Sequence, residues 1–115
     1  MIAVIFEVDV AEGRMDRYLA LAAALLGELE TIDGFLSVER FQSMSAPNRL
    51  VSLSFFRDEK AVQQWRNTTA HRATQAHGRA FIFTNYRLRV SNVIRDYGMV
   101  DRIEAPADSV SVHTL

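Results

Sequence analysis

Four stretches of the chain alternate between apolar and polar side chains, which is the pattern of a β-strand with two different faces. In the first stretch Val4 and Phe6 share one face and Glu7 lies on the other, and in the second, strict alternation places Phe35 on the face of Phe41. The third is apolar on both faces, so we expect it at the centre of a sheet. The last is polar on one side, which suits an edge strand. The predicted strands span residues 2–10, 35–44, 50–56 and 86–95.

Between the strands, apolar residues recur at intervals of three and four, which is the helical pattern. The first helix is expected to end before Gly34, because glycine readily adopts the left-handed backbone found after helix ends. Asp58 is a candidate N-cap for a second helix, and Thr68 or Thr69 can cap a third. A short apolar connector then leads to the last strand. The predicted helices and the connector span residues 14–32, 59–65, 70–79 and 81–83.

The order βαββαβ predicts an α+β, ferredoxin-like domain over residues 1–99, with helices on one face of an antiparallel four-stranded sheet. The uncovered face would carry side chains too apolar to leave in water, and a homodimer is the simplest way to cover them. Residues 100–115 show little periodicity and are interpreted as a tail or dimer arm, whose Val110, Val112 and Leu115 could dock on a partner subunit. The apolar residues of the uncovered face are Ala3, Ile5, Val51, Leu53 and Phe55.

Composition narrows the classes of partner. The 115 residues are enough for one domain, and a formal net charge of -1 provides no basic footprint for nucleic acid. There is no cysteine, which excludes disulfides and thiolate chemistry. Nor does any apolar run approach the length needed to cross a bilayer. We therefore expect a cytoplasmic protein with neither nucleic acid nor membrane as partner.

Three blocks carry a resemblance to a known family. The segments IDGFLSVERFQS, LSFFRDEKAVQQWRNTTAHRATQ and YRLRVSNVIRDYG, in this order of elements, resemble the antibiotic biosynthesis monooxygenase (ABM) family over residues 1–99. The resemblance implies a dimeric α/β barrel with a ligand pocket in each subunit between the sheet and its helices. Members include cofactor-free monooxygenases that act on phenolic polyketides and quinols, haem-degrading enzymes, and proteins of no known activity.

Some family positions match and others do not. Polyketide-oxidising members have a tryptophan at the end of the third strand, where this chain has Phe56. Haem-degrading members have an asparagine on the first strand, a tryptophan in the second helix and a later histidine that binds iron. Those positions correspond here to Phe6, Trp65 and approximately Gln75, while His71 matches a histidine common across the family.

Two residues are candidates for catalysis. His71 could act as a general base near neutral pH, and the alternative is a histidine near a helix start that bonds to backbone or water. Trp65 could form the wall of an aromatic pocket, and the alternative is a core residue that closes the helix onto the sheet. His71 and His77 are six positions apart on one helix, so they point to different sides and cannot hold one metal ion together.

Six further residues are candidates for substrate binding. The three phenylalanines could line a pocket for a planar molecule or be ordinary core, and the two serines could bond a ligand or each other. The arginine could bind a carboxylate or quinone oxygen, with a salt bridge or a solvated strand end as the alternative. The six are Phe6, Arg40, Ser52, Ser54, Phe56 and Phe83.

These observations lead to one main hypothesis and two alternatives. Phosphate-binding loops, dinucleotide fingerprints and zinc motifs are absent from the sequence, so no flavin, nicotinamide or metal cofactor is expected. The main hypothesis is a cofactor-independent monooxygenase that uses dioxygen to oxidise a small aromatic, phenolic or quinol-like compound. One alternative is a non-catalytic protein that binds a small ligand in the same pocket. The other is a haem-binding or haem-degrading protein.

Overall fold

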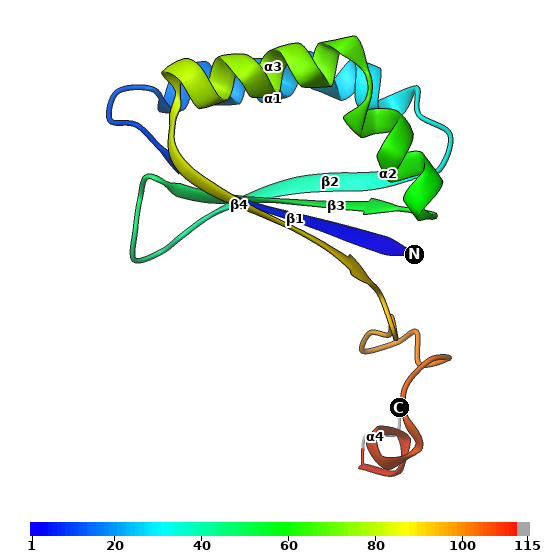
Figure 1. The fold of residues 1–115 in the computed structure, drawn as a ribbon. Helices are drawn as coiled ribbons and strands as arrows, with labels where there is room; N and C mark the ends of the chain where they lie inside the picture. The colour runs from blue at the N-terminus through cyan, green and yellow to red at the C-terminus, as the bar shows by residue number, and fades with distance from the viewer. Residues whose placement is uncertain (113–115) are drawn as a thin grey trace.

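The computed structural model describes residues 1–112, and it has the α+β architecture that the sequence predicts. A four-stranded antiparallel sheet carries its long helices on one face (Figure 1). The tail leaves the sheet on the opposite side. The elements are β1 (Ile2–Val10), α1 (Met15–Glu30), β2 (Phe35–Gln42), β3 (Arg49–Phe56), α2 (Glu59–Arg66), α3 (Thr69–Phe81), β4 (Phe83–Asn92) and α4 (Ala107–Val112).

The strands are ordered β2-β3-β1-β4, so β3 and β1 form the centre of the sheet and β4 is an edge. The central position of β3 and the edge position of β4 were both predicted. The predicted limits of the last strand are wrong by three residues, because β4 begins at Phe83, which pairs with Val10, and ends at Asn92. The connector expected at 81–83 is therefore shorter: Phe81 ends α3, and Ile82 alone precedes the strand.

A bulge at the start of β2 changes the predicted face of Phe35. Phe35 pairs with Phe56 and Ser37 with Phe55, so Leu36 is an extra residue on β2. Strict alternation placed Phe35 on the face of Phe41, and Phe41 pairs with Val51 of the uncovered face. Instead Phe35 packs under the helices against Phe56, with ring centroids 5.7 Å apart in an edge-to-face arrangement.

The core lies in two clusters at opposite ends of the sheet, both under the helices. One contains Phe56, Leu29 and Val62, and the other contains Val8 and Ile82 among its members. Side chains from the sheet and from helices α1, α2 and α3 face one another between the two clusters and leave a cavity there. The site described below occupies this space.

Capping residues set the break between α2 and α3. The Asp58 carboxylate accepts a hydrogen bond from the Ala61 N–H at 2.9 Å, and the Thr68 hydroxyl accepts one from the His71 N–H at 3.2 Å. Both are side-chain caps of the kind predicted. Gly34 has a φ of 95°, in agreement with the expected left-handed backbone. Because Thr68 starts a new helix directly after α2, the last turn of α2 and the first turn of α3 lie next to each other.

The tail is more ordered than predicted. Residues 107–112 form the short helix α4, and Pro106 accepts hydrogen bonds from the N–H groups of Ser109 and Val110 at 3.0 Å. Leu115, proposed above as a docking residue, lies outside the described residues. Across the part of the chain that the structure describes, no helix is both long and apolar enough to cross a membrane.

Candidate functional site

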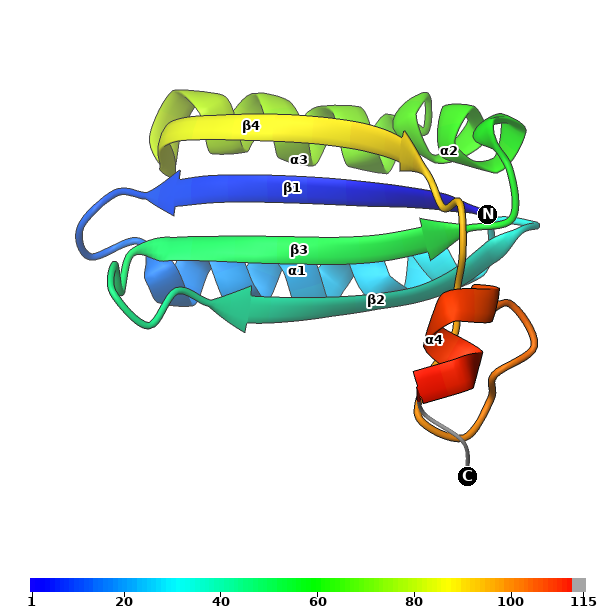
Figure 2. The same ribbon diagram turned by 90° about the horizontal axis from the view of Figure 1, so that it is seen from below.

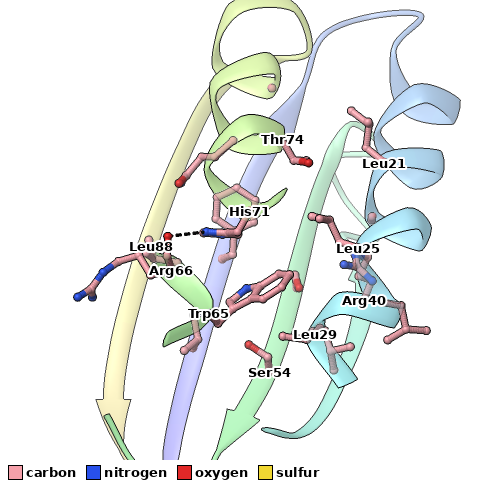
Figure 3. A pocket seen from close by; sticks show the side chains of 18 of the residues that line it. Leu21, Leu25, Leu29, Arg40, Ser54, Trp65, Arg66, His71, Thr74 and Leu88 are labelled. Carbon is pink, nitrogen blue, oxygen red and sulfur yellow. Dashed lines mark hydrogen bonds between the residues drawn. The ribbon is translucent and has the colours of Figure 1, made fainter. Parts of the chain in front are cut away.

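A cavity of about 310 Å³ lies between the helix-covered face of the sheet and helices α1, α2 and α3. This volume is within the range of small-molecule binding sites. Its walls are mostly apolar, and Figure 3 shows side chains from α1 on one side and from α3 on the other, both directed into the gap between them. The apolar lining includes Leu21, Leu25 and Leu29 of α1. The cavity can therefore hold a small, largely apolar molecule.

All eight residues singled out in the sequence line this one cavity. They come from six different elements, so their convergence is a property of the fold and not of their spacing along the chain. Their functional roles stay predictions. The eight are Phe6 (β1), Arg40 (β2), Ser52, Ser54 and Phe56 (β3), Trp65 (α2), His71 (α3) and Phe83 (β4).

Trp65 and His71 meet at the junction of α2 and α3. The Thr68 cap turns the chain between them, and their ring centroids lie 5.0 Å apart at an interplanar angle of 43°. Trp65 also packs against the core cluster that contains Phe56. It therefore combines the two roles considered for it, since it closes the helix onto the sheet and forms part of the cavity wall.

The hydrogen bonding of His71 defines its tautomer. The Nδ1 atom lies 3.3 Å from the backbone carbonyl oxygen of Arg66 (dashed line in Figure 3). A carbonyl can only accept a hydrogen bond, so Nδ1 carries the proton, and the lone pair of the neutral ring is on Nε2. Within residues 1–112 no protein group is hydrogen-bonded to this Nε2. A hydrogen bond to the backbone was the alternative to a catalytic role for His71. That bond is present, but it uses Nδ1 and leaves the basic Nε2 free.

Burial also keeps His71 unprotonated. Loss of solvent around the ring lowers the pKa of His71 below its usual value, and the nearby Arg72 and Arg66 charges lower it further, while the bond to the Arg66 carbonyl acts in the opposite direction. At neutral pH the ring is therefore uncharged. A neutral imidazole with a free Nε2 is a suitable proton acceptor.

The charged side chains found in the cavity lining are basic. Its lining includes Arg40, Arg66 and His71 but no aspartate or glutamate. Arg66 is exposed, and its side chain points away from the cavity in Figure 3. Arg40 forms none of the four salt bridges found within residues 1–112, and its Nε is buried without a hydrogen-bond partner. Within residues 1–112 the salt bridge considered for Arg40 is not formed, and the side chain as a whole stays partly exposed.

The sequence did not single out the parts of the lining that come from α1 and the middle of α3. The leucines of α1 have helical spacing, which indicates a core-facing surface without distinguishing a cavity wall from a packed core. Thr74 and Gln75 of α3 also reach the cavity. Gly78 allows the Phe83 ring to pack close to α3, since a Cβ there would lie 2.6 Å from that ring. In the sequence, a glycine within a helix followed five residues later by a phenylalanine is the signal that could have indicated this contact between α3 and the Phe83 ring.

The residues offer no obvious metal centre. Among the described residues, no group of three or more histidine, cysteine, aspartate or glutamate side chains is placed to hold a metal ion. Gln75, at the approximate position of the iron-binding histidine of haem-degrading proteins, lines the cavity, and an amide is not among the usual axial ligands of haem iron. The lining therefore does not fit a haem site of that type.

Comparison with known proteins agrees with this architecture. A family model described as antibiotic biosynthesis monooxygenase matches residues 1–77. Jasmonate monooxygenase ABM from Pyricularia oryzae is 44% identical over 93 residues, which is 81% of this chain and 43% of that protein. Uncharacterized protein YqjZ from Bacillus subtilis is 34% identical over 62 residues, which is 54% of this chain and 53% of that protein. The chain thus spans about half the length of the curated relatives it matches.

A solved structure supports the fold independently. The protein Rv0793 from Mycobacterium tuberculosis superposes with a TM-score of 0.75 at 18% sequence identity, covering 84% of this chain and 98% of that one.

Proposed function

The chain belongs to the antibiotic biosynthesis monooxygenase family, and on that basis we propose that it is a cofactor-independent monooxygenase that oxidises a small aromatic, phenolic or quinol-like compound. The observation that carries the proposal is the neutral His71 ring, which lines an apolar cavity beside Trp65 with its Nε2 free. A base in a largely apolar cavity can deprotonate a weak acid and shield the resulting anion from water.

The proposed reaction needs no external reductant. For a phenol with a free C–H opposite the hydroxyl, His71 Nε2 takes the O–H proton, and the phenolate transfers one electron to dioxygen. The phenoxyl radical and superoxide combine at the ring carbon, and the peroxide recovers the proton from His71. Loss of water, made from the ring C–H proton and the terminal hydroxide, leaves a quinone. One oxygen atom enters the product and the other leaves as water, so the substrate supplies all the electrons.

We expect the purified chain to consume dioxygen with at least one member of a panel of phenols and hydroquinones. The panel also includes jasmonate, because the Pyricularia oryzae relative is named for it. An oxygen electrode measures the rate, and the double variant Trp65→Phe, His71→Ala is the matched protein control. Uptake by the wild type no faster than by this variant, for every compound, would reject the oxygenase.

The same samples separate the alternatives. Saturable binding of a panel compound without oxygen uptake would identify a non-catalytic binding protein. A Soret shift on titration with haem that disappears in His71→Ala would favour a haem-binding protein instead, with His71 as the iron ligand.

We further propose that the chain forms a homodimer through the sheet face opposite the helices. Cross-strand pairing of Ala3 with Phe55 and of Ile5 with Leu53 places these apolar side chains on that face. Figure 2 views it directly: the long helices lie behind the sheet, and only the tail with the short helix α4 lies in front, at one end of β2 and β3. The Glu7–Arg89 ion pair, at 2.9 Å, joins β1 and β4 on the same face. A second copy packed sheet to sheet would remove this apolar surface from water.

The C-terminal segment supports a second copy as the occupant. It extends away from the domain (Figure 1), and the Cα radius of gyration is 16.6 Å, against about 13 Å for a compact chain of this length. Large apolar side chains along it have little cover: Ile94 is 79% exposed, Val100 81% and Ile103 92%. An extended arm with uncovered apolar residues, leaving the uncovered face of the sheet, is expected to pack on the partner subunit.

The expected mass in sedimentation equilibrium at micromolar concentration is that of two chains. Leu53→Glu, which places a charge on the uncovered face, is expected to give a single-chain mass. The matched control is Leu19→Glu, because Leu19 is on α1, on the other side of the sheet, and is 43% exposed. A single-chain mass for the wild type, or equal masses for the wild type and Leu53→Glu, would contradict the dimer.

A further inference from the structure

The position of Arg40 places a positive charge inside the cavity. Arg40 is on β2, paired in register with Ser52 of β3, and both residues line the cavity. Figure 3 shows Arg40 on the side of the cavity covered by α1, with His71 on the side covered by α3. The arginine therefore faces the same space as the proposed base but from another wall.

Among the described residues this charge has no opposite charge bound to it. A guanidinium stays protonated throughout the physiological pH range. Within residues 1–112 Arg40 has no salt-bridge partner, and its buried Nε donates no hydrogen bond. The part of the cavity lining that residues 1–112 provide contains no carboxylate. The Arg40 side chain is partly buried, and a buried N–H such as that of its Nε is unfavourable without an acceptor, so the free cavity favours a molecule that brings an anionic oxygen.

We propose that the cavity selects a ligand with an apolar body and a carboxylate, which is held by Arg40. The fork of N–H donors on a guanidinium matches the two oxygens of a carboxylate. The Ser52 hydroxyl, in the neighbouring register position, is a second donor on the same wall. The apolar body would lie against Leu25, Leu29 and Trp65. The inference rests on the cavity of the proposed function, but it concerns ligand binding and is independent of the oxidation step.

A pair of probes of nearly the same shape, one with a carboxylate and one with a neutral amide, tests the proposal. Isothermal titration of the full chain with 1-naphthoate and with the isosteric neutral 1-naphthamide measures the preference for a carboxylate. We expect the wild type to bind the naphthoate roughly tenfold to hundredfold more tightly, which is the usual contribution of a hydrogen-bonded charge. In Arg40→Gln this preference is expected to disappear while the affinity for the amide stays unchanged.

Two further variants keep the test specific. Arg66→Gln removes an arginine that points out of the cavity and should leave the preference intact. Arg40→Lys keeps the charge without the planar fork and should retain part of it, which also covers the case in which Arg40→Gln does not fold. Equal binding of the two probes by the wild type, no binding of either, or an undiminished preference in Arg40→Gln would overturn the proposal.

The failure of the carboxylate-site proposal can be distinguished from the failure of the oxygenase proposal. Preference for the naphthoate together with no oxygen uptake from any panel compound would reject the oxygenase and support the carboxylate site. Oxygen uptake together with equal affinities for the two probes would reject the carboxylate site alone.

Discussion

Replacing His71 with alanine is expected to lower kcat for oxygen uptake by roughly 10²- to 10⁴-fold, the usual contribution of a general base. Among residues 1–112, His71 is the one histidine that lines the cavity, and the variant removes its imidazole while the Thr68 cap, which bonds to the backbone N–H of residue 71, can remain. Substrate affinity should change little, because the apolar walls and Arg40 are untouched. Steady-state oxygen consumption, with the panel compound that the wild type oxidises fastest, measures both quantities.

The control for this variant is His77→Ala. His77 is on the same helix, but its Nε2 accepts a hydrogen bond from Arg17 at 3.3 Å, and it does not line the cavity. Its removal should leave kcat within about twofold, since a surface substitution away from the site seldom has larger effects. Equal losses in the two variants would show that His71 acts through helix stability and not as a base.

The dependence on pH has a defined sign. Only the neutral imidazole accepts a proton, so kcat falls when the pH drops below the pKa of His71. Burial lowers that pKa below the 6.5 of a free histidine side chain, and the acidic limb of the wild-type profile is therefore expected below this value. The residual activity of His71→Ala should lack the limb. An identical limb in both proteins would assign the titration to another group.

Replacing Phe56 with alanine is expected to reduce the free energy of unfolding by about 3–5 kcal/mol, the usual range for a fully buried phenylalanine. Phe56 is 1% exposed, packs edge to face on Phe35, and belongs to the cluster that joins β3 to α1 and α2. The loss is large because the variant gives up the edge-to-face contact with Phe35 and the packing against α1 and α2, and the vacated space enlarges the cavity. Urea denaturation followed by circular dichroism measures it.

The control is Phe81→Ala, which removes the same side chain from the last residue of α3. Phe81 is 64% exposed, so its removal should cost less than about 1 kcal/mol. Similar losses in the two variants would show that Phe56 is not the core residue described here. The stability measurement is also needed to interpret activity data. Phe56 lines the cavity, and a Phe56 variant can lose activity because it unfolds and not because a ligand contact is lost.

The strand and helix pattern was predictable because each element carries its own periodicity. Alternation over residues 2–10 and helical spacing over 14–32 are local properties, and the caps Asp58 and Thr68 bond within three residues of themselves. The face of Phe35 was not predictable, since the bulge at Leu36 depends on the pairing of β2 with β3. The start of β4 was missed for a similar reason: Phe83 belongs to the strand because it pairs with Val10.

The sequence by itself determined the order of elements, the fold class, the family and the list of eight candidate residues. The tertiary structure decided that these eight line one cavity and that, within residues 1–112, neither the Nε2 of His71 nor the Nε of Arg40 has a hydrogen-bond partner. The physical reason is the range of the interactions involved. Periodicity and capping act over a few residues of one segment, whereas burial, charge pairing and the orientation of a ring depend on segments distant in the chain. Arg40 illustrates the difference, because an arginine in an alternating strand usually ends in solvent, and only the packing of α1 over β2 and β3 places this one in a cavity.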